Sequence, residues 1–162
     1  MLLIIDASVL IAFYSQNELD EPYLLHQLSY NGCTLIIPVA VFEEIKNGKK
    51  PTIDMLSKAV DSGIISINKE ITNEETITFR KLHPRLDDGE IQVLLLGLKY
   101  KALGTSYYCS IDEDPGRHVA DRIGVATKGT KGLITLLNEK QIIDKQKMES
   151  LFYRLNHCNF RA

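Results

Sequence analysis

The chain has 162 residues, a formal net charge of −2, and apolar and charged fractions of 44% and 25%. A chain of this length can bury one substantial core, so we expect a single domain over residues 1–162. The slightly negative charge argues against a protein that coats DNA through a basic surface. It leaves open an enzyme that contacts nucleic acid through a local patch and metal ions.

The cysteines and the N-terminus favour a cytoplasmic protein. Cys33, Cys109 and Cys158 lie far apart and form no CxxC or Cys/His pattern, which fits a reducing compartment. The N-terminus lacks a basic segment and a small-residue cleavage site, so no signal peptide is expected. No stretch approaches the roughly 18 apolar residues of a membrane helix, so we predict no membrane association.

The predicted elements begin with a strand at residues 2–5, whose apolar run without polar alternation is typical of a strand buried on both faces. Helical spacing follows at residues 7–14. Asp6 separates the two, at the sheet edge where open α/β folds bind ligands. Asp is also a preferred N-cap residue, so helix capping is the alternative role for Asp6.

Strands and helices alternate along the rest of the chain. Further strands are predicted at residues 34–37, 64–67 and 107–111, with a last short one at 125–127. Helices are predicted at residues 23–28, 38–47 (with Pro38 in its first position), 53–60, 74–82, 88–100, 115–123, 132–139 and 144–155. This alternation predicts an α/β fold with a mainly parallel sheet covered by helices on both sides.

The strand at residues 107–111 repeats the pattern of the first strand, with an acid at its carboxyl end. Asp112 is the first acid after this strand, and Glu113 and Asp114 follow it. Asp114 precedes Pro115, so helix capping is the favoured role for this aspartate. Glu113 is expected to be solvated.

Two glutamates lie beside buried helix faces. At about 100° per residue, Glu44 lies on the flank of its helix's buried stripe, whereas Glu43 points to solvent. Two ordinary surface glutamates are the alternative. Glu90 begins the most apolar helix, between its two buried stripes, where an acid also stabilises the helix N-terminus. Asp88 is a candidate N-cap of that helix.

Acidic residues occur near four boundaries between predicted strands and helices, and such a set suits a hard divalent cation. Mg²⁺ and Mn²⁺ take carboxylate and water oxygens, and such a cluster without a cation would be self-repelling. One or two bound metals can generate hydroxide and stabilise the leaving oxygen of a phosphodiester. The four histidines are scattered and give no zinc pattern.

Basic residues near the last acids are candidate substrate contacts. Arg117 follows these acids closely, and Lys128 and Lys131 flank Gly129 and Thr130 before a helix. The start of that helix could bind phosphate through backbone N–H groups. The favoured alternative is a solvated loop with Thr130 as the N-cap.

Four segments together resemble the PIN-domain family of metal-dependent ribonucleases, which includes VapC-type toxins. They are LLIIDASVLIAF, VFEEI, LDDGEIQVLLLGLKY and SIDEDPGRHVADRIGVATKGTKGLITLL. The last two segments resemble the archaeal and bacterial subfamily that has a GE helix and a GT-x-G-L helix. The resemblance spans nearly the whole chain.

The resemblance implies a three-layer α/β/α sandwich, dependence on Mg²⁺ or Mn²⁺, frequent homodimers and, in operons of the toxin type, a protein antitoxin. Asp6, Glu44, Glu90 and Asp112 match the family's acids, with Asp114 as support or as an alternative to Asp112. Ser8 matches a small hydroxyl position near the site.

The leading hypothesis is a metal-dependent endoribonuclease, which could be the toxin of a toxin–antitoxin pair. The alternative is a PIN-like module that holds RNA or a protein partner without useful catalysis. A third option, phosphoryl transfer with Asp6 as nucleophile, ranks lower because a second aspartate would be expected where Ser8 stands.

Overall fold

The computed structural model describes residues 1–157. Within this range the strands are β1 (Leu2–Ile5), β2 (Thr34–Pro38), β3 (Ile65–Asn68) and β4 (Tyr107–Ser110). The helices are α1 (Ala7–Tyr14), α2 (Pro22–Tyr30), α3 (Val39–Lys46), α4 (Lys50–Asp61), α5 (Asn73–Leu82), α6 (Asp88–Ala102), α7 (Asp114–Ile123), α8 (Thr130–Glu139) and α9 (Lys145–Asn156).

The strands form one parallel sheet in the order β3-β2-β1-β4. From β1 the chain moves to β2 and β3 on one side, and then crosses to β4 on the other side of β1. Leu3 is therefore paired with Leu35 in β2 and with Tyr108 in β4. The change in direction makes the boundary between β1 and β4 a topological switch point, where open α/β sheets place their ligands.

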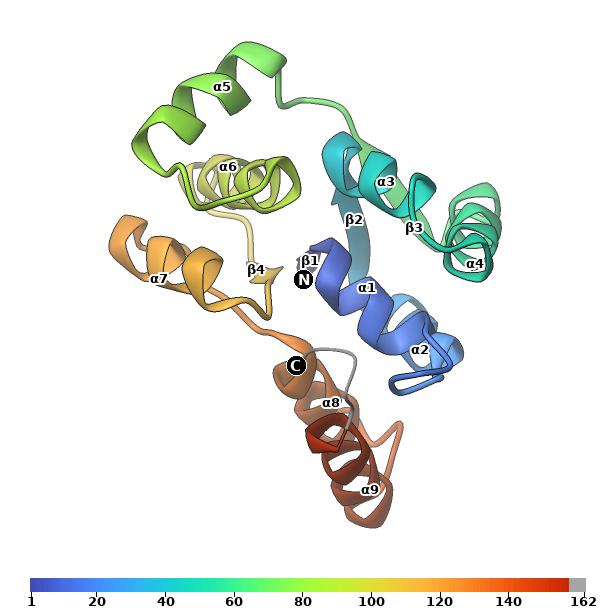
Figure 1. Cartoon of the computed structure of the whole chain (residues 1–162). Helices are drawn as coiled ribbons and strands as arrows, with labels where there is room; N and C mark the ends of the chain where they lie inside the picture. The colour runs from blue at the N-terminus through green and yellow to red at the C-terminus, as the bar shows by residue number, and fades with distance from the viewer. Residues whose placement is uncertain (158–162) are drawn as a thin grey trace.

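Helices flank the sheet on both sides (Figure 1), as the sequence predicts. Helix α6 packs against β1, β2 and β4, whereas α2 packs against β2 from the other side. Strands β1 and β2 are mostly apolar, and Leu3, Ile4 and Ile5 have no exposed surface. Burial on both faces explains why these strands show no polar alternation.

Gln92 of α6 ties three helices together inside the protein. Its side-chain carbonyl accepts a hydrogen bond from the backbone N–H of Ala40 in α3 at 3.0 Å, and its amide donates to the Thr76 hydroxyl of α5 at 3.2 Å. The side chain is 6% exposed, so both polar ends need these partners. The bond to Ala40 fixes the start of the helix that carries Glu44.

Several predicted elements differ from the structure in their bounds or their existence. Pro38 is the last residue of β2 and the N-cap of α3, with an extended ψ of 163°, rather than the first helical residue. The last short strand is wrong, because Thr127 forms only an isolated parallel bridge with Cys109. Helix α4 also begins earlier than predicted, at Lys50, because Pro51 is well tolerated in a first helical turn.

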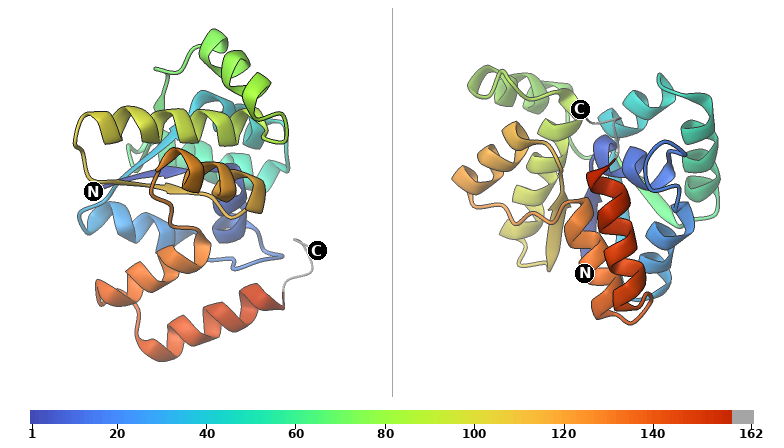
Figure 2. Two further views of the ribbon diagram at one scale, coloured as in Figure 1. Left: turned by 90° about the vertical axis from the view of Figure 1, so that its left-hand side faces the viewer. Right: turned by 60° about the horizontal axis from the view of Figure 1, so that its bottom comes forward.

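Helices α8 and α9 pack against each other as a helical hairpin at the opposite end of the molecule from α5 (Figure 2). Among residues 1–157, no helix combines the length and the apolar character needed to cross a membrane.

Candidate active site

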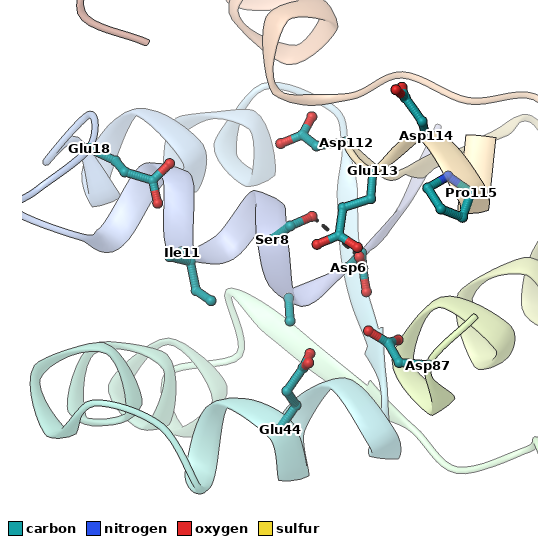
Figure 3. A pocket seen from close by; sticks show the side chains of 11 residues that line it. Asp6, Ser8, Ile11, Glu18, Glu44, Asp87, Asp112, Glu113, Asp114 and Pro115 are labelled. Atoms are coloured by element: carbon teal, nitrogen blue, oxygen red, sulfur yellow. Dashed lines mark hydrogen bonds between the residues drawn. The ribbon is translucent and has the colours of Figure 1, made fainter. Parts of the chain in front are cut away.

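A cavity of about 640 Å³ opens beside the carboxyl ends of β1 and β4, at the switch point of the sheet (Figure 3). Acidic side chains from several elements line this cavity, which we call the acidic cavity. They are Asp6, Glu18, Glu44, Asp87, Asp112, Glu113 and Asp114. Parallel strands that end at one sheet edge bring Asp6 and Asp112 to the same side of the molecule.

Asp6 follows β1 directly and is 3% exposed. It occupies the N-cap position of α1, as the capping alternative predicts, but its side chain makes no capping hydrogen bond. The Ser8 hydroxyl donates to Asp6 Oδ2 at 3.3 Å, whereas the buried Oδ1 has no hydrogen-bond partner. A buried carboxylate oxygen without a donor is costly, which points to a ligand.

Asp87 and Glu90 are held by a capping box at the start of α6. Asp87 Oδ1 accepts from the Glu90 backbone N–H at 2.8 Å, and Glu90 Oε1 accepts from the Asp87 backbone N–H at 3.2 Å. The N-cap is therefore Asp87 and not Asp88. The box leaves Glu90 Oε2 buried and without a partner, on a side chain that is 2% exposed.

Helix α7 approaches this carboxylate closely. A Cβ on Gly116 would lie 2.5 Å from Glu90 Oε2, so any larger residue there would force the two apart. Glu113 occupies the N-cap position of α7 in place of Asp114, and its side chain makes no capping hydrogen bond. Although Glu113 is exposed as expected, one carboxylate oxygen from each of Asp87, Glu90 and Glu113 lies within 4.8 Å of the others.

Burial, together with the proximity of these acids to one another, raises the pKa of three of them. Burial raises the pKa of Asp6 well above its usual value, and the Asp87 and Glu90 charges add to the effect. Burial, followed by the Asp87 charge, raises the pKa of Glu90 from 4.5 to about 7. Burial also raises the pKa of Glu44, and Asp87 and Glu113 add to it. The atoms available as metal ligands here are all carboxylate oxygens, and two of them are buried without a hydrogen-bond partner. This set of ligands fits a hard divalent cation.

The other predicted acids lie at the rim of this group. Glu44 of α3 faces the acidic cavity from the opposite wall, whereas Glu43 does not line it. Asp112 lines the cavity too, but its oxygens accept from the Thr130 backbone N–H at 2.7 Å and from the Thr130 hydroxyl at 2.5 Å. Figure 3 shows Asp114 pointing away from Asp6, Asp87 and Glu113.

The predicted basic contacts gather in a second hollow that shares Asp112 with the acidic cavity. Arg117 of α7 lines it together with Lys128 and Lys131. Thr130 is the first residue of α8, 1% exposed, and Gly129 is the N-cap, so the predicted Thr130 cap is wrong. A Cβ on Gly129 would lie 2.5 Å from Asp112 Oδ1, so the glycine permits the bond between Asp112 and Thr130.

Sequence reasoning missed three acids near this site, Glu18, Asp87 and Glu113. The signal for Asp87 was present, because an aspartate three residues before a glutamate, ahead of an apolar run, is the pattern of a capping box. Glu113 carried no comparable signal. Its approach to Glu90 depends on how α7 packs against α6, which no local pattern encodes.

The molecule is an α/β protein with an acidic cluster at the switch point of its parallel sheet, an arrangement consistent with a metal site. The family model described as DUF3368: PIN domain matches residues 2–162. The chain therefore belongs to the PIN-domain family, a nuclease family whose members are typically metal-dependent and bind nucleic acids. A search of curated proteins gave no match.

Proposed function

We propose that this protein is a metal-dependent endoribonuclease that hydrolyses phosphodiester bonds of RNA with Mg²⁺ or Mn²⁺. The observation that carries the proposal is the pair of buried, unpartnered oxygens Asp6 Oδ1 and Glu90 Oε2, at a point where acids from several elements converge. Burial, and then the charges of neighbouring acids, raises the pKa of both groups, and a bound cation would offset both effects.

Within this proposal, Asp6 and Glu90 hold the cation together with Asp87 and Glu113, whose carboxylates already approach Glu90. When bound, the metal supplies a hydroxide nucleophile and neutralises charge on the leaving oxygen. Asp112, offered by the family resemblance as a ligand, is assigned a positioning role because Thr130 engages both its oxygens. Asp114 lies at the rim and supports the negative field.

The remaining side chains of the site accept a proton, position Asp6 or contact the substrate. Glu44 faces the site with a raised pKa, which suits a group that accepts a proton from the attacking water. Ser8 holds the Asp6 carboxylate in place by its hydrogen bond. Arg117, Lys128 and Lys131 contact substrate phosphates in the hollow beside Asp112.

The Asp6→Asn substitution tests the proposal. It keeps the size of the side chain and removes a ligand charge, so Mn²⁺-stimulated RNA cleavage should fall by roughly 100-fold or more. Asp61→Asn is the matched control, since Asp61 is exposed at the end of α4 and does not line the acidic cavity. Cleavage of a labelled RNA and thermal unfolding should be followed together. Equal cleavage by the purified Asp6→Asn variant would contradict the proposal.

Calorimetry separates the nuclease from a PIN-like binding module without useful catalysis. The nuclease should take up Mn²⁺ with heat that Asp6→Asn removes, whereas no binding at millimolar Mn²⁺ favours the module. A toxin role would be favoured by a neighbouring reading frame that encodes a small DNA-binding protein.

A further inference from the structure

A third hollow, of about 250 Å³, adjoins the acidic cavity on another side of α7. It lies between α7 and the segment that connects α5 to α6. Its polar lining consists of His83 and Arg85 from the connecting segment and His118 and Arg122 from α7. We call it the histidine–arginine hollow. Leu86 and Val119, both nearly buried, form part of its apolar floor.

This hollow carries positive charge without local compensation. No acidic side chain lines it. Within residues 1–157, neither Arg85 nor Arg122 forms an ion pair. Nearby cations behave differently, because Arg80 pairs with Asp88 and Lys99 lies 3.5 Å from Glu75. Two unpaired guanidinium groups converging on one concave surface are suited to bind an anion.

The histidine–arginine hollow lies beside α7, close to the acidic cavity. Arg117 lines the hollow beside Asp112, whereas the next residue, His118, lines the histidine–arginine hollow together with Arg122, one helical turn further on. The first hollow shares Asp112 with the acidic cavity, and the second shares Pro115 with it. The acidic cavity therefore adjoins a basic hollow on each side of the N-terminal end of α7.

We propose that the histidine–arginine hollow binds the phosphodiester backbone of an RNA strand on the side of the acidic cavity away from Lys128 and Lys131. This inference rests on the proposed function. A strand whose scissile phosphate lies at the acidic group passes over the start of α7 and places phosphates in both hollows. Arg85 and Arg122 contact these phosphates through paired N–H groups, and the two hollows offset the repulsion between RNA and the acids.

The double substitution Arg85→Gln, Arg122→Gln tests the proposal. Binding of a fluorescent single-stranded RNA should be titrated at several salt concentrations, from low salt upward, in EDTA so that no strand is cleaved. Each phosphate contact to a single strand contributes about 0.7 to the slope of log affinity against log salt, so losing two should reduce the slope by about 1.4. The matched control is Lys58→Gln, Lys81→Gln, which removes the same charge outside both hollows.

The outcomes separate this inference from the proposed function. A reduced slope in the arginine pair, with the control pair unchanged, supports it even if the native protein cleaves no RNA. A native slope in the arginine pair overturns it even if the native protein cleaves RNA with Mn²⁺, and so does an equal loss in the control pair. If the arginine pair keeps the native RNA slope but loses binding of polyglutamate, the hollow is a protein-docking site and the proposal is wrong.

Discussion

Two successive helices of this protein begin with the same capping motif and differ in what the motif does. At the start of α5, Thr72 and Glu75 exchange backbone-to-side-chain hydrogen bonds, and at the start of α6, Asp87 and Glu90 do the same. The first box lies at the surface. The second is turned inward, and Glu90 is 2% exposed.

The same local geometry accompanies pKa shifts of opposite sign in Glu75 and Glu90. The hydrogen bond from the Thr72 backbone lowers the pKa of Glu75, with further lowering from Lys99. Burial raises the pKa of Glu90 to about 7, with further raising by Asp87, and outweighs the equivalent backbone bond. The motif therefore fixes where the carboxylate points, and the tertiary environment decides whether it is an ordinary surface charge or a candidate ligand.

The largest expected contrast is in activity. Glu90→Gln should reduce Mn²⁺-dependent RNA cleavage by roughly 100-fold, because the amide keeps the capping geometry and loses the ligand charge. Glu75→Gln is the same change in the surface box. It should leave cleavage within about twofold of the native rate, since substitutions at the surface, away from the acidic cavity, have small effects. Single-turnover cleavage of a labelled RNA measures both. Equal loss in the two variants would mean that Glu90 acts only as a structural cap.

The second contrast is in the pH dependence of stability without metal. Glu90 ionises near 4.5 when unfolded and near 7 when folded, so between these values the folded state binds more protons. Its contribution is complete below pH 4.5 and is lost as the pH rises through 7, a fall of roughly 2 to 3 kcal/mol. Glu75 acts in the opposite direction, because its pKa is lowered on folding.

Urea unfolding in EDTA at several pH values measures this dependence. Glu90→Gln should flatten the decline above pH 5, although Asp6, whose pKa is also raised, should leave part of it. A decline that is unchanged in Glu90→Gln would show that Glu90 does not carry the titration.

The smallest contrast is in the caps themselves. Thr72→Ala should lower the free energy of unfolding by about 1 kcal/mol, the usual value of an N-cap. Asp87→Ala should cost less in EDTA, because losing the cap is offset by removing a charge that repels Glu90 and Asp6. Added Mn²⁺ should reverse this order if Asp87 is a ligand. Chemical denaturation of both variants, with and without Mn²⁺, provides the measurement.

Much of the fold could be predicted from the sequence because the central strands β1 and β2 are largely buried on both faces. The apolar runs before Asp6 and Asp112 identify β1 and β4, and their parallel pairing brings both acids to one edge. The boundaries were harder, because Pro38 satisfies both a strand end and a helix start. Thr127 looked like a strand residue but makes only a single bridge.

The site was harder to predict from the sequence, because burial and hydrogen-bond partners from distant parts of the chain decide whether a carboxylate oxygen is free to bind a metal. Rotation about the α3 axis correctly distinguished Glu44 from Glu43 as the glutamate that faces the acidic cavity. The same reasoning could not show that Thr130, 18 residues further along the chain, engages both oxygens of Asp112. Nor could it show that Gly116 lets α7 approach Glu90.

The pairing of β1 with β4 also has a consequence for synthesis on the ribosome. Residues 2–5 are synthesised before their partners at residues 107–110, which emerge roughly 5 to 20 s later, at about 5–20 residues per second. Glu113 arrives later still, and Thr130 after it. A nascent chain therefore carries Asp6 long before it has a complete acidic group.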